Sequence, residues 1–234
     1  MMKLALIIGG SRGLGLALAE QYRTAGWVVY EFSRSGTGEG HIELDLVGND
    51  FSAYTNLLQQ LAQADWQEIV LINNAATILP IKPVTQMGQD ELMAALQLNF
   101  SHPLLLLHEF VVTFAQHPAR KVLAQISSGA ALRPIAAWAS YCASKAGVDH
   151  FMAVLALEQS TAKYPILAIV LDPGVMDTAM QATIRASDPA QFPELARFIA
   201  RKEQGVLRPA AEVAQFCRAA IARAQQGLRY DIDG

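Results

Sequence analysis

Short aliphatic runs alternate along the chain with longer segments in which apolar positions recur every three or four residues. The short runs predict strands at residues 4–8, 27–32, 41–44, 68–72, 121–126, 166–171 and 228–232. The longer segments predict helices at residues 14–25, 51–64, 89–116, 138–161 and 210–226. Gly26 is a normal stop for the first helix, and Pro103 is expected to disturb the third because proline has no backbone N–H to donate.

Strands separated by helices of this length predict βαβ units and a mostly parallel sheet. Near-continuous apolar strands, such as residues 69–72, fit a sheet that helices cover on both faces. We therefore expect an α/β fold, a doubly wound parallel sheet formed by a single domain over residues 1–234. Residues 174–209 form a long irregular segment, for which we expect a substrate lid, with an ordinary surface excursion as the alternative.

Composition narrows the classes of function. A chain with 52% apolar and 17% charged residues is not intrinsically disordered. The net charge of −3 argues against a nucleic-acid partner, which would favour a basic surface. No run reaches the roughly 18 apolar residues of a membrane span. Two cysteines fit a reducing compartment, and the five histidines show no metal-ligand spacing, so we expect a cytoplasmic protein without a metal, nucleic-acid or membrane partner.

A glycine-rich turn joins the first predicted strand to the first helix, with Gly9, Gly13 and Gly15 in the spacing G-x-x-x-G-x-G. Glycine lets the chain turn tightly and lets a phosphate approach the bare backbone. The helix that follows offers unpaired N–H groups and the positive end of its dipole. The place of this turn, after the first strand, favours a dinucleotide site over an ordinary tight turn.

The residues that follow the second strand bear on the choice of coenzyme. NAD enzymes place a carboxylate there for the ribose 2′-hydroxyl, whereas NADP enzymes place a cation for the 2′-phosphate. This chain has Ser33 and Arg34 at that point, with Arg12 in the glycine turn, and two guanidinium groups suit one phosphate. We expect NADP(H). Two solvated surface arginines are the alternative, and Glu31 complicates the choice if it faces the same side.

Tyr141 and Lys145 lie four residues apart, on one face of a predicted helix. The pKa of a free tyrosine is about 10, so a nearby cation is needed to make the phenol useful near neutral pH. Ser128 ends the fifth predicted strand, a short distance before Tyr141. The spacing Y-x-x-x-K alone is common, and its value here comes from this serine and from the glycine turn upstream.

Taken in order, these motifs resemble those of the short-chain dehydrogenase/reductase family over nearly the full chain. The matching positions are the glycine turn, Asp45, residues 73–76, Asn99, residues 126–128, Tyr141, Lys145, Pro173, Gly174 and Thr178. Ile8 and Ala76 depart from the family, which often has threonine before the first glycine and glycine at the end of N-N-A-G. The resemblance implies a Rossmann-like fold and a nicotinamide coenzyme.

The resemblance also implies residue roles. Tyr141 would protonate the carbonyl oxygen of the substrate as hydride reaches the carbon, and Ser128 would hydrogen-bond that oxygen. Lys145 would hold the nicotinamide ribose and stabilise the tyrosinate, and Asn99 would support a proton-relay water to Lys145. Coenzyme contacts are implied for Gly9, Ser11, Arg12, Gly13, Leu14, Gly15, Ser33, Arg34, Asp45, Leu46, Asn74, Ala75, Ala76, Tyr141, Lys145, Pro173, Gly174, Val175 and Thr178.

Within the family the chain is most similar to the sepiapterin reductase group, at residues 138–142, 155–158, 173–178 and 227–231. In that group a carboxylate near the C-terminus anchors the guanidine-like edge of the pterin, and Asp231 falls at the matching position, with a solvated terminal acid as the equal alternative. Bacterial relatives of this type reduce vicinal diketones such as benzil, so the resemblance implies a dicarbonyl reductase more firmly than a pterin enzyme. The expected substrate contacts are Ser128, Trp138, Tyr141 and Asp231.

The leading interpretation is therefore an NADPH-dependent carbonyl reductase acting on a small ketone or α-dicarbonyl. An alcohol dehydrogenase of the same family and a catalytically silent nucleotide-sensing protein are the alternatives. Apolar side chains surround the predicted helix over residues 103–116, and the helix over residues 141–160 adds more. As the resemblance also implies, we expect these helices to pair across a twofold axis in a homodimer or homotetramer, with burial under the lid or the final helix as the alternative.

Overall fold

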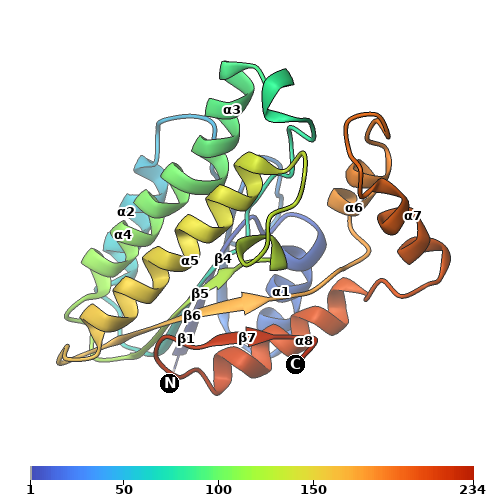
Figure 1. Cartoon of the computed structure of the whole chain (residues 1–234). Coiled ribbons are helices and arrows are strands. Elements are labelled where there is room, and N and C mark those ends of the chain that lie inside the picture. The colour runs from blue at the N-terminus through green and yellow to red at the C-terminus, as the bar shows by residue number, and fades with distance from the viewer. Residues whose placement is uncertain (1) are drawn as a thin grey trace.

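The computed structural model describes residues 2–234, which form one sheet of seven parallel strands in the order β3-β2-β1-β4-β5-β6-β7 (Figure 1). The strands are β1 (Met2–Ile8), β2 (Val28–Ser33), β3 (His41–Glu43), β4 (Trp66–Asn73), β5 (Arg120–Ile126), β6 (Ile166–Asp172) and β7 (Arg229–Asp231). The strand order reverses between β1 and β4. The predicted doubly wound parallel sheet is confirmed.

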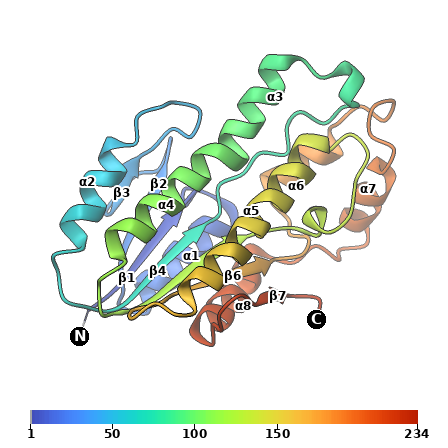
Figure 2. The ribbon, with the colours of Figure 1, turned by 60° about the vertical axis from the view of Figure 1, so that its left-hand side comes forward.

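Helices cover both faces of this sheet (Figures 1 and 2). The helices α2 (Ser52–Leu61), α4 (His102–Phe114) and α5 (Ala139–Gln159) bury their apolar sides against one face. The other face is covered by α1 (Gly13–Thr24) and α8 (Ala210–Ala222). Aliphatic strands buried on both sides, such as β1 and β4, follow from this arrangement because their side chains alternate between the two cores.

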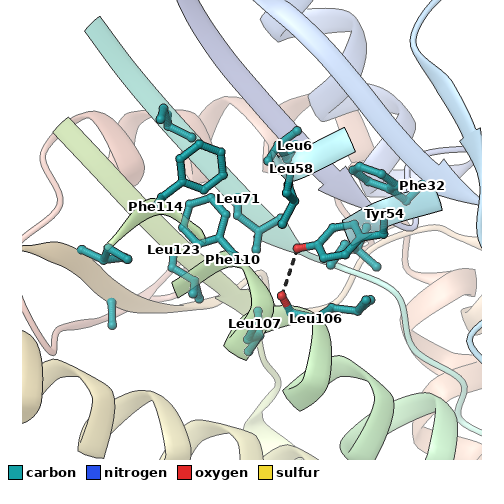
Figure 3. Packing of buried hydrophobic residues seen from close by; sticks show 14 of the residues in the cluster. Leu6, Phe32, Tyr54, Leu58, Leu71, Leu106, Leu107, Phe110, Phe114 and Leu123 are labelled. Carbon is teal, nitrogen blue, oxygen red and sulfur yellow. Dashed lines mark hydrogen bonds between the residues drawn. The ribbon is translucent and has the colours of Figure 1, made fainter. Parts of the chain in front are cut away.

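The larger core joins α2 to α4 through Tyr54 (Figure 3). The Tyr54 hydroxyl donates a hydrogen bond to the Leu106 carbonyl oxygen at 3.0 Å, and its ring meets Phe32 edge to face at a centroid distance of 5.0 Å. Phe110 and Phe114 are fully buried beside it. A buried phenol needs such a partner because an unpaired hydroxyl would lose its hydration without compensation.

The predicted helix over residues 89–116 is divided in the structure. It consists of α3 (Gln89–Leu96), a π-helical turn (Gln97–Ser101) and α4, which ends at Phe114. An uninterrupted α-helix would require residue 103 to donate its N–H to the Asn99 carbonyl, and proline has none. The widened turn therefore falls just before Pro103, and it carries Asn99.

The predicted helix over residues 210–226 ends early, at Ala222. The amide of Gln226 explains the early end: its oxygen accepts from the Ala168 N–H at 2.7 Å and its nitrogen donates to the Ile166 carbonyl at 3.1 Å. These bonds tie the connection to β6 and deliver the chain into β7 beside it.

Residues 174–209 contain two short helices, α6 (Ala179–Arg185) and α7 (Leu195–Glu203). They lie together beyond the end of β6 (Figure 1). Their apolar side chains join a third cluster with residues that follow β4 and β5. No helix within the described residues is long and apolar enough to cross a membrane.

Candidate active site

A cavity of about 650 Å³ opens at the carboxyl ends of the strands, where the strand order reverses. Ligands of open parallel sheets bind at such reversal points because the loops on either side diverge there. Nearly all the predicted site residues line it: Gly9, Ser11, Arg12, Gly13, Leu14, Ser33, Arg34, Asp45, Leu46, Asn74, Ala75, Ala76, Ser128, Trp138, Tyr141, Lys145, Pro173, Gly174, Val175, Thr178 and Asp231. Of the predicted set, Gly15 and Asn99 do not line the cavity.

Two glycines of the turn, Gly9 and Gly15, are packed too closely to carry a side chain. Gly9 has φ of +81°, and a Cβ there would lie 2.8 Å from the Ala75 Cα. A Cβ on Gly15 would lie 2.0 Å from the Gly9 carbonyl oxygen, which also accepts a hydrogen bond from the Asn74 amide at 2.8 Å. The turn therefore presents bare backbone and the start of α1 to the cavity, which fits a phosphate. Gly15 serves the turn by its small size.

The far end of the cavity beyond β2 is basic. Arg12 and Arg34 line it and are exposed. Neither guanidinium forms an ion pair with a carboxylate anywhere in residues 2–234. Both are free to pair with an anion that enters there.

Glu31 lies close to this basic end but does not line it. Its side chain is buried beneath the glycine turn, within reach of His41 Nδ1 at 2.5 Å, and it is absent from the residues that line the cavity. Its carboxylate also accepts from the Ser33 hydroxyl at 3.3 Å, and Ser33 in turn accepts from the Gly36 N–H at 3.0 Å. Glu31 thus braces the loop after β2 and leaves the cavity wall to Ser33 and Arg34.

Ser128, Tyr141 and Lys145 meet in the middle of the cavity. The spacing along α5 places Lys145 Nζ 5.7 Å from the centroid of the Tyr141 ring. Lys145 Nζ also donates to the Ile126 carbonyl at 2.8 Å, at the end of β5. The Ser128 hydroxyl, two residues further along, accepts from the Ala130 N–H at 3.2 Å and lies beside the phenol. The predicted grouping of these three side chains is what the structure shows.

Burial shifts the pKa values of both Tyr141 and Lys145. It raises the pKa of Tyr141 to about 12, and the neighbouring Ser128 hydroxyl opposes that rise. Burial lowers the pKa of Lys145 to about 8, and the carboxylates of Asp149 and Asp172 oppose that fall. At neutral pH the phenol is therefore protonated and the amine is mostly an ammonium.

Asn99 lies one layer behind the cavity wall and is almost fully buried. Its amide oxygen accepts from the Thr77 N–H and its amide nitrogen donates to the Thr77 carbonyl, each at 2.8 Å. Thr77 itself lines the cavity. The π-helical turn thus uses Asn99 to fix the loop after β4, a contact that the order of motifs alone did not reveal.

Residues 3–189 match the short chain dehydrogenase family. The chain belongs to this family. Members are oxidoreductases that bind a nicotinamide coenzyme, and the bare glycine turn, the helix N-terminus and the basic end of the cavity fit such a group.

Several relatives are close enough to be informative. The chain is 38% identical to a benzil reductase ((S)-benzoin forming) of Bacillus subtilis over 214 residues, 88% of each chain. It is 32% identical to the sepiapterin reductase of Xenopus tropicalis over 83% of this chain and 69% of that one. A crystal structure of a short chain dehydrogenase/reductase from Saccharomyces cerevisiae shares the fold, with a TM-score of 0.80 and 22% identity over 99% of this chain and 96% of that one.

The inner end of this dehydrogenase's cavity, beneath α6 and α7, combines aromatic side chains with Arg133, Arg197 and Arg201, and of the aromatic group sequence reasoning identified only Trp138. Trp138 stacks on Phe192 at a centroid distance of 5.4 Å and an interplanar angle of 14°, and Phe198 lies 5.4 Å away. Phe198 lines the cavity and Phe192 supports it from behind. These phenylalanines come from residues 174–209, where the irregular pattern carried no signal that paired them with Trp138. The indole Nε1 of Trp138 is buried and has no hydrogen-bond partner among residues 2–234.

Proposed function

We propose that this short chain dehydrogenase is an NADPH-dependent carbonyl reductase that acts on ketones and α-dicarbonyls. The observation that carries the proposal is the grouping of Ser128, Tyr141 and Lys145 in the wall of a cavity whose inner end is aromatic and whose outer end is basic. An oxidoreductase needs little more than a coenzyme cradle and a proton donor to reduce a carbonyl group.

The chain's own groups handle the proton and the charge, while the bound reduced coenzyme would supply the hydride. Tyr141 donates its phenolic proton to the carbonyl oxygen, and the phenol carries this proton at neutral pH. Its burial makes it a weaker acid, which the nearby Lys145 ammonium offsets by stabilising the tyrosinate. The Ser128 hydroxyl donates a hydrogen bond to the same oxygen. The Lys145 ammonium would hold the nicotinamide ribose and stabilise the tyrosinate that remains.

The remaining lining residues have supporting roles in this proposal. Thr178 and the backbone at Val175 would hold the nicotinamide carboxamide, and Asp45 with Leu46 would border the adenine. Asn99 supports a water that relays protons to Lys145, and its bonds to Thr77 give the relay a fixed wall. Residues 174–209 act as the lid, since α6 and α7 supply part of the cavity wall.

NADPH is proposed over NADH on charge and geometry. Arg12 and Arg34 are free of carboxylate partners, whereas the carboxylate of Glu31 is buried beneath the glycine turn, is within reach of His41 and Ser33, and does not line the cavity. A 2′-phosphate would supply the missing counter-charge.

A vicinal dicarbonyl is the proposed substrate class. Two aryl groups would pack in the cluster around Trp138 and Phe198. Benzil reductase relatives support this choice. An alcohol dehydrogenase working in the oxidative direction uses the same groups in reverse and stays an alternative, as does a silent nucleotide sensor.

A pterin side chain is the second candidate substrate. Asp231 lines the cavity at the end of β7, is exposed, and forms no ion pair within the described chain. Its carboxylate is available for the guanidine-like edge of a pterin, and sepiapterin reductases are among the relatives.

We also propose that α4 and α5 pair with the same helices of a second copy, in a homodimer or homotetramer. Their outward sides carry exposed apolar residues, including Leu105, Val112, Val154 and Leu157. The lid and the final helix leave these side chains uncovered. Both cysteines are free thiols, which suits the proposed cytoplasmic location.

Replacing the proton donor tests the reaction. Tyr141→Phe should lower turnover of benzil by about 100-fold or more, because general acid catalysis is lost. The dissociation constant for NADPH, measured by fluorescence quenching, should stay within about twofold. Tyr164→Phe, at the opposite end of the sheet, is the control. Turnover equal to that of the unaltered enzyme would refute the assignment.

Removing the guanidinium of Arg34 tests the proposed preference for NADPH over NADH. Arg34→Ala should narrow the preference for NADPH over NADH by about tenfold, because a charge-assisted contact to the 2′-phosphate is lost. The measurement is kcat/KM with each coenzyme, and Arg223→Ala, on a distant surface, is the control. An unchanged ratio counts against the contact.

Neutralising the terminal carboxylate separates the two substrate classes. Asp231→Asn should raise KM for sepiapterin several-fold and leave KM for benzil unchanged, because benzil has no cationic edge. Asp233→Asn is the matched control, since Asp233 lines the same cavity and pairs with Arg208 at 2.7 Å. Equal effects on both substrates would remove the proposed anchor.

Sedimentation tests the proposed contact between subunits. The unaltered protein should sediment as a multiple of its 25.4 kDa chain, and Leu157→Glu should shift it toward the monomer because a charge would enter the interface. Leu132→Glu, an equally exposed leucine elsewhere, is the control. A single monomeric species for the unaltered protein would end the proposal.

A further inference from the structure

Three charged residues lie directly behind the Ser128–Tyr141–Lys145 group. They are Asp149 on α5, Asp172 at the end of β6, and Arg229 at the start of β7. These elements are neighbours in the fold (Figure 1). None of the three was among the expected site residues, and Arg229 comes from the last strand of the chain, far from the others in sequence.

Arg229 bridges the two acids. Its Nη1 donates to Asp149 Oδ2 at 2.6 Å, and its Nη2 donates to Asp172 Oδ2 at 2.6 Å. The same Nη2 donates to the Ser128 carbonyl oxygen at 3.1 Å. Asp149 Oδ2 also accepts from the Ser127 hydroxyl at 2.7 Å. The planar, multidentate guanidinium is the group that can reach all these oxygens at once.

This arrangement fixes the backbone that carries the catalytic serine. The Ser128 carbonyl accepts from the Ala131 N–H at 2.9 Å in the short turn that follows β5. Arg229 adds a second donor to this carbonyl from β7, and Ser127 is held on its other side by Asp149. The Ser128 hydroxyl is thereby kept beside the phenol.

The charges of the cluster do not cancel on their own. Two carboxylates, Asp149 and Asp172, face one guanidinium, and all three side chains are at least three-quarters buried. The remaining negative charge faces Lys145, which lies one helical turn before Asp149. The Lys145 amine has one other titratable neighbour in addition to Asp149, Asp172 and Arg229, namely the phenol of Tyr141. Both carboxylates raise the pKa of Lys145, against its burial.

We propose that Asp149 and Arg229 are positioning residues of this active site: Arg229 holds the Ser128 backbone in place, and the unbalanced Asp149 carboxylate keeps Lys145 in its ammonium form. The catalytic meaning of this inference rests on the proposed function, but the charge relation between Asp149 and Lys145 does not. The two parts can therefore be measured separately.

The charge relation is tested on the protein without coenzyme. Lysine labelled with ¹³C at Cε reports its own titration by NMR, and the Lys145 signal is assigned by its loss in Lys145→Arg. Asp149→Asn preserves the shape of the side chain and its acceptor oxygen but removes the charge. The titration midpoint of Lys145 should fall by about one pH unit, since a carboxylate that favours the ammonium is gone. Glu158→Gln, on the exposed side of α5, should leave it unchanged.

The catalytic consequence is tested by a pH profile. Removing a nearby negative charge makes both proton losses of the Tyr141–Lys145 pair easier, whichever group loses its proton first. The alkaline fall of kcat for benzil reduction should therefore move to lower pH in Asp149→Asn, and not in Glu158→Gln. Arg229→Lys keeps the charge but cannot bridge both acids, so it should lower kcat without moving the alkaline fall.

The outcomes separate the two proposals. A Lys145 midpoint that is unchanged in Asp149→Asn, in a variant with normal thermal unfolding, overturns the inference. An unaltered enzyme that reduces no carbonyl compound refutes the proposed function, while the NMR titration still decides the charge relation. A shifted midpoint with an unmoved kcat profile would show that the charge of Asp149 reaches Lys145 but not the rate, and would overturn the catalytic part alone.

Discussion

Tyr141 and Lys145 are buried side by side on one face of α5, and much of the surrounding structure serves to make this burial tolerable. A charged amine and a phenol removed from water are expensive unless other polar groups compensate them. The Ile126 carbonyl binds the amine directly, and the acids behind it supply opposite charge. The same burial keeps the phenol protonated at neutral pH, which is the state that a proton donor requires.

The parallel sheet brings these groups together because its strands all end at the same edge. Elements far apart in the chain meet there: the glycine turn after β1, the loop after β4 held by Asn99, and the serine after β5. The two ends of the cavity differ: exposed arginines line the end beyond β2, whereas the end beneath α6 and α7 adds an aromatic cluster to Arg133, Arg197 and Arg201.

The likeness to benzil and sepiapterin reductases agrees with both ends of the cavity, but in different ways. The aromatic cluster around Trp138 suits an aryl dicarbonyl, whereas Asp231 suits a cationic heterocycle. The two features lie in one cavity, so the substrate depends on which of them supplies the binding energy.

The amino-acid sequence by itself determined the parallel sheet, the glycine turn and the pairing of Tyr141 with Lys145, because each depends on local periodicity or on spacing within one element. Ser128 follows β5, and it was added to this pair by its place in the order of the family's motifs. The sequence placed Asn99 among the site residues but missed its bonds to Thr77, and it left the side faced by Glu31 open. Only the tertiary structure decided the Asn99–Thr77 contact and the position of Glu31, and only it joined Phe192 to Trp138 and Arg229 to Ser128. Such contacts link segments that are remote in the chain, and no local pattern of hydrophobic or polar residues records which remote side chains will become neighbours.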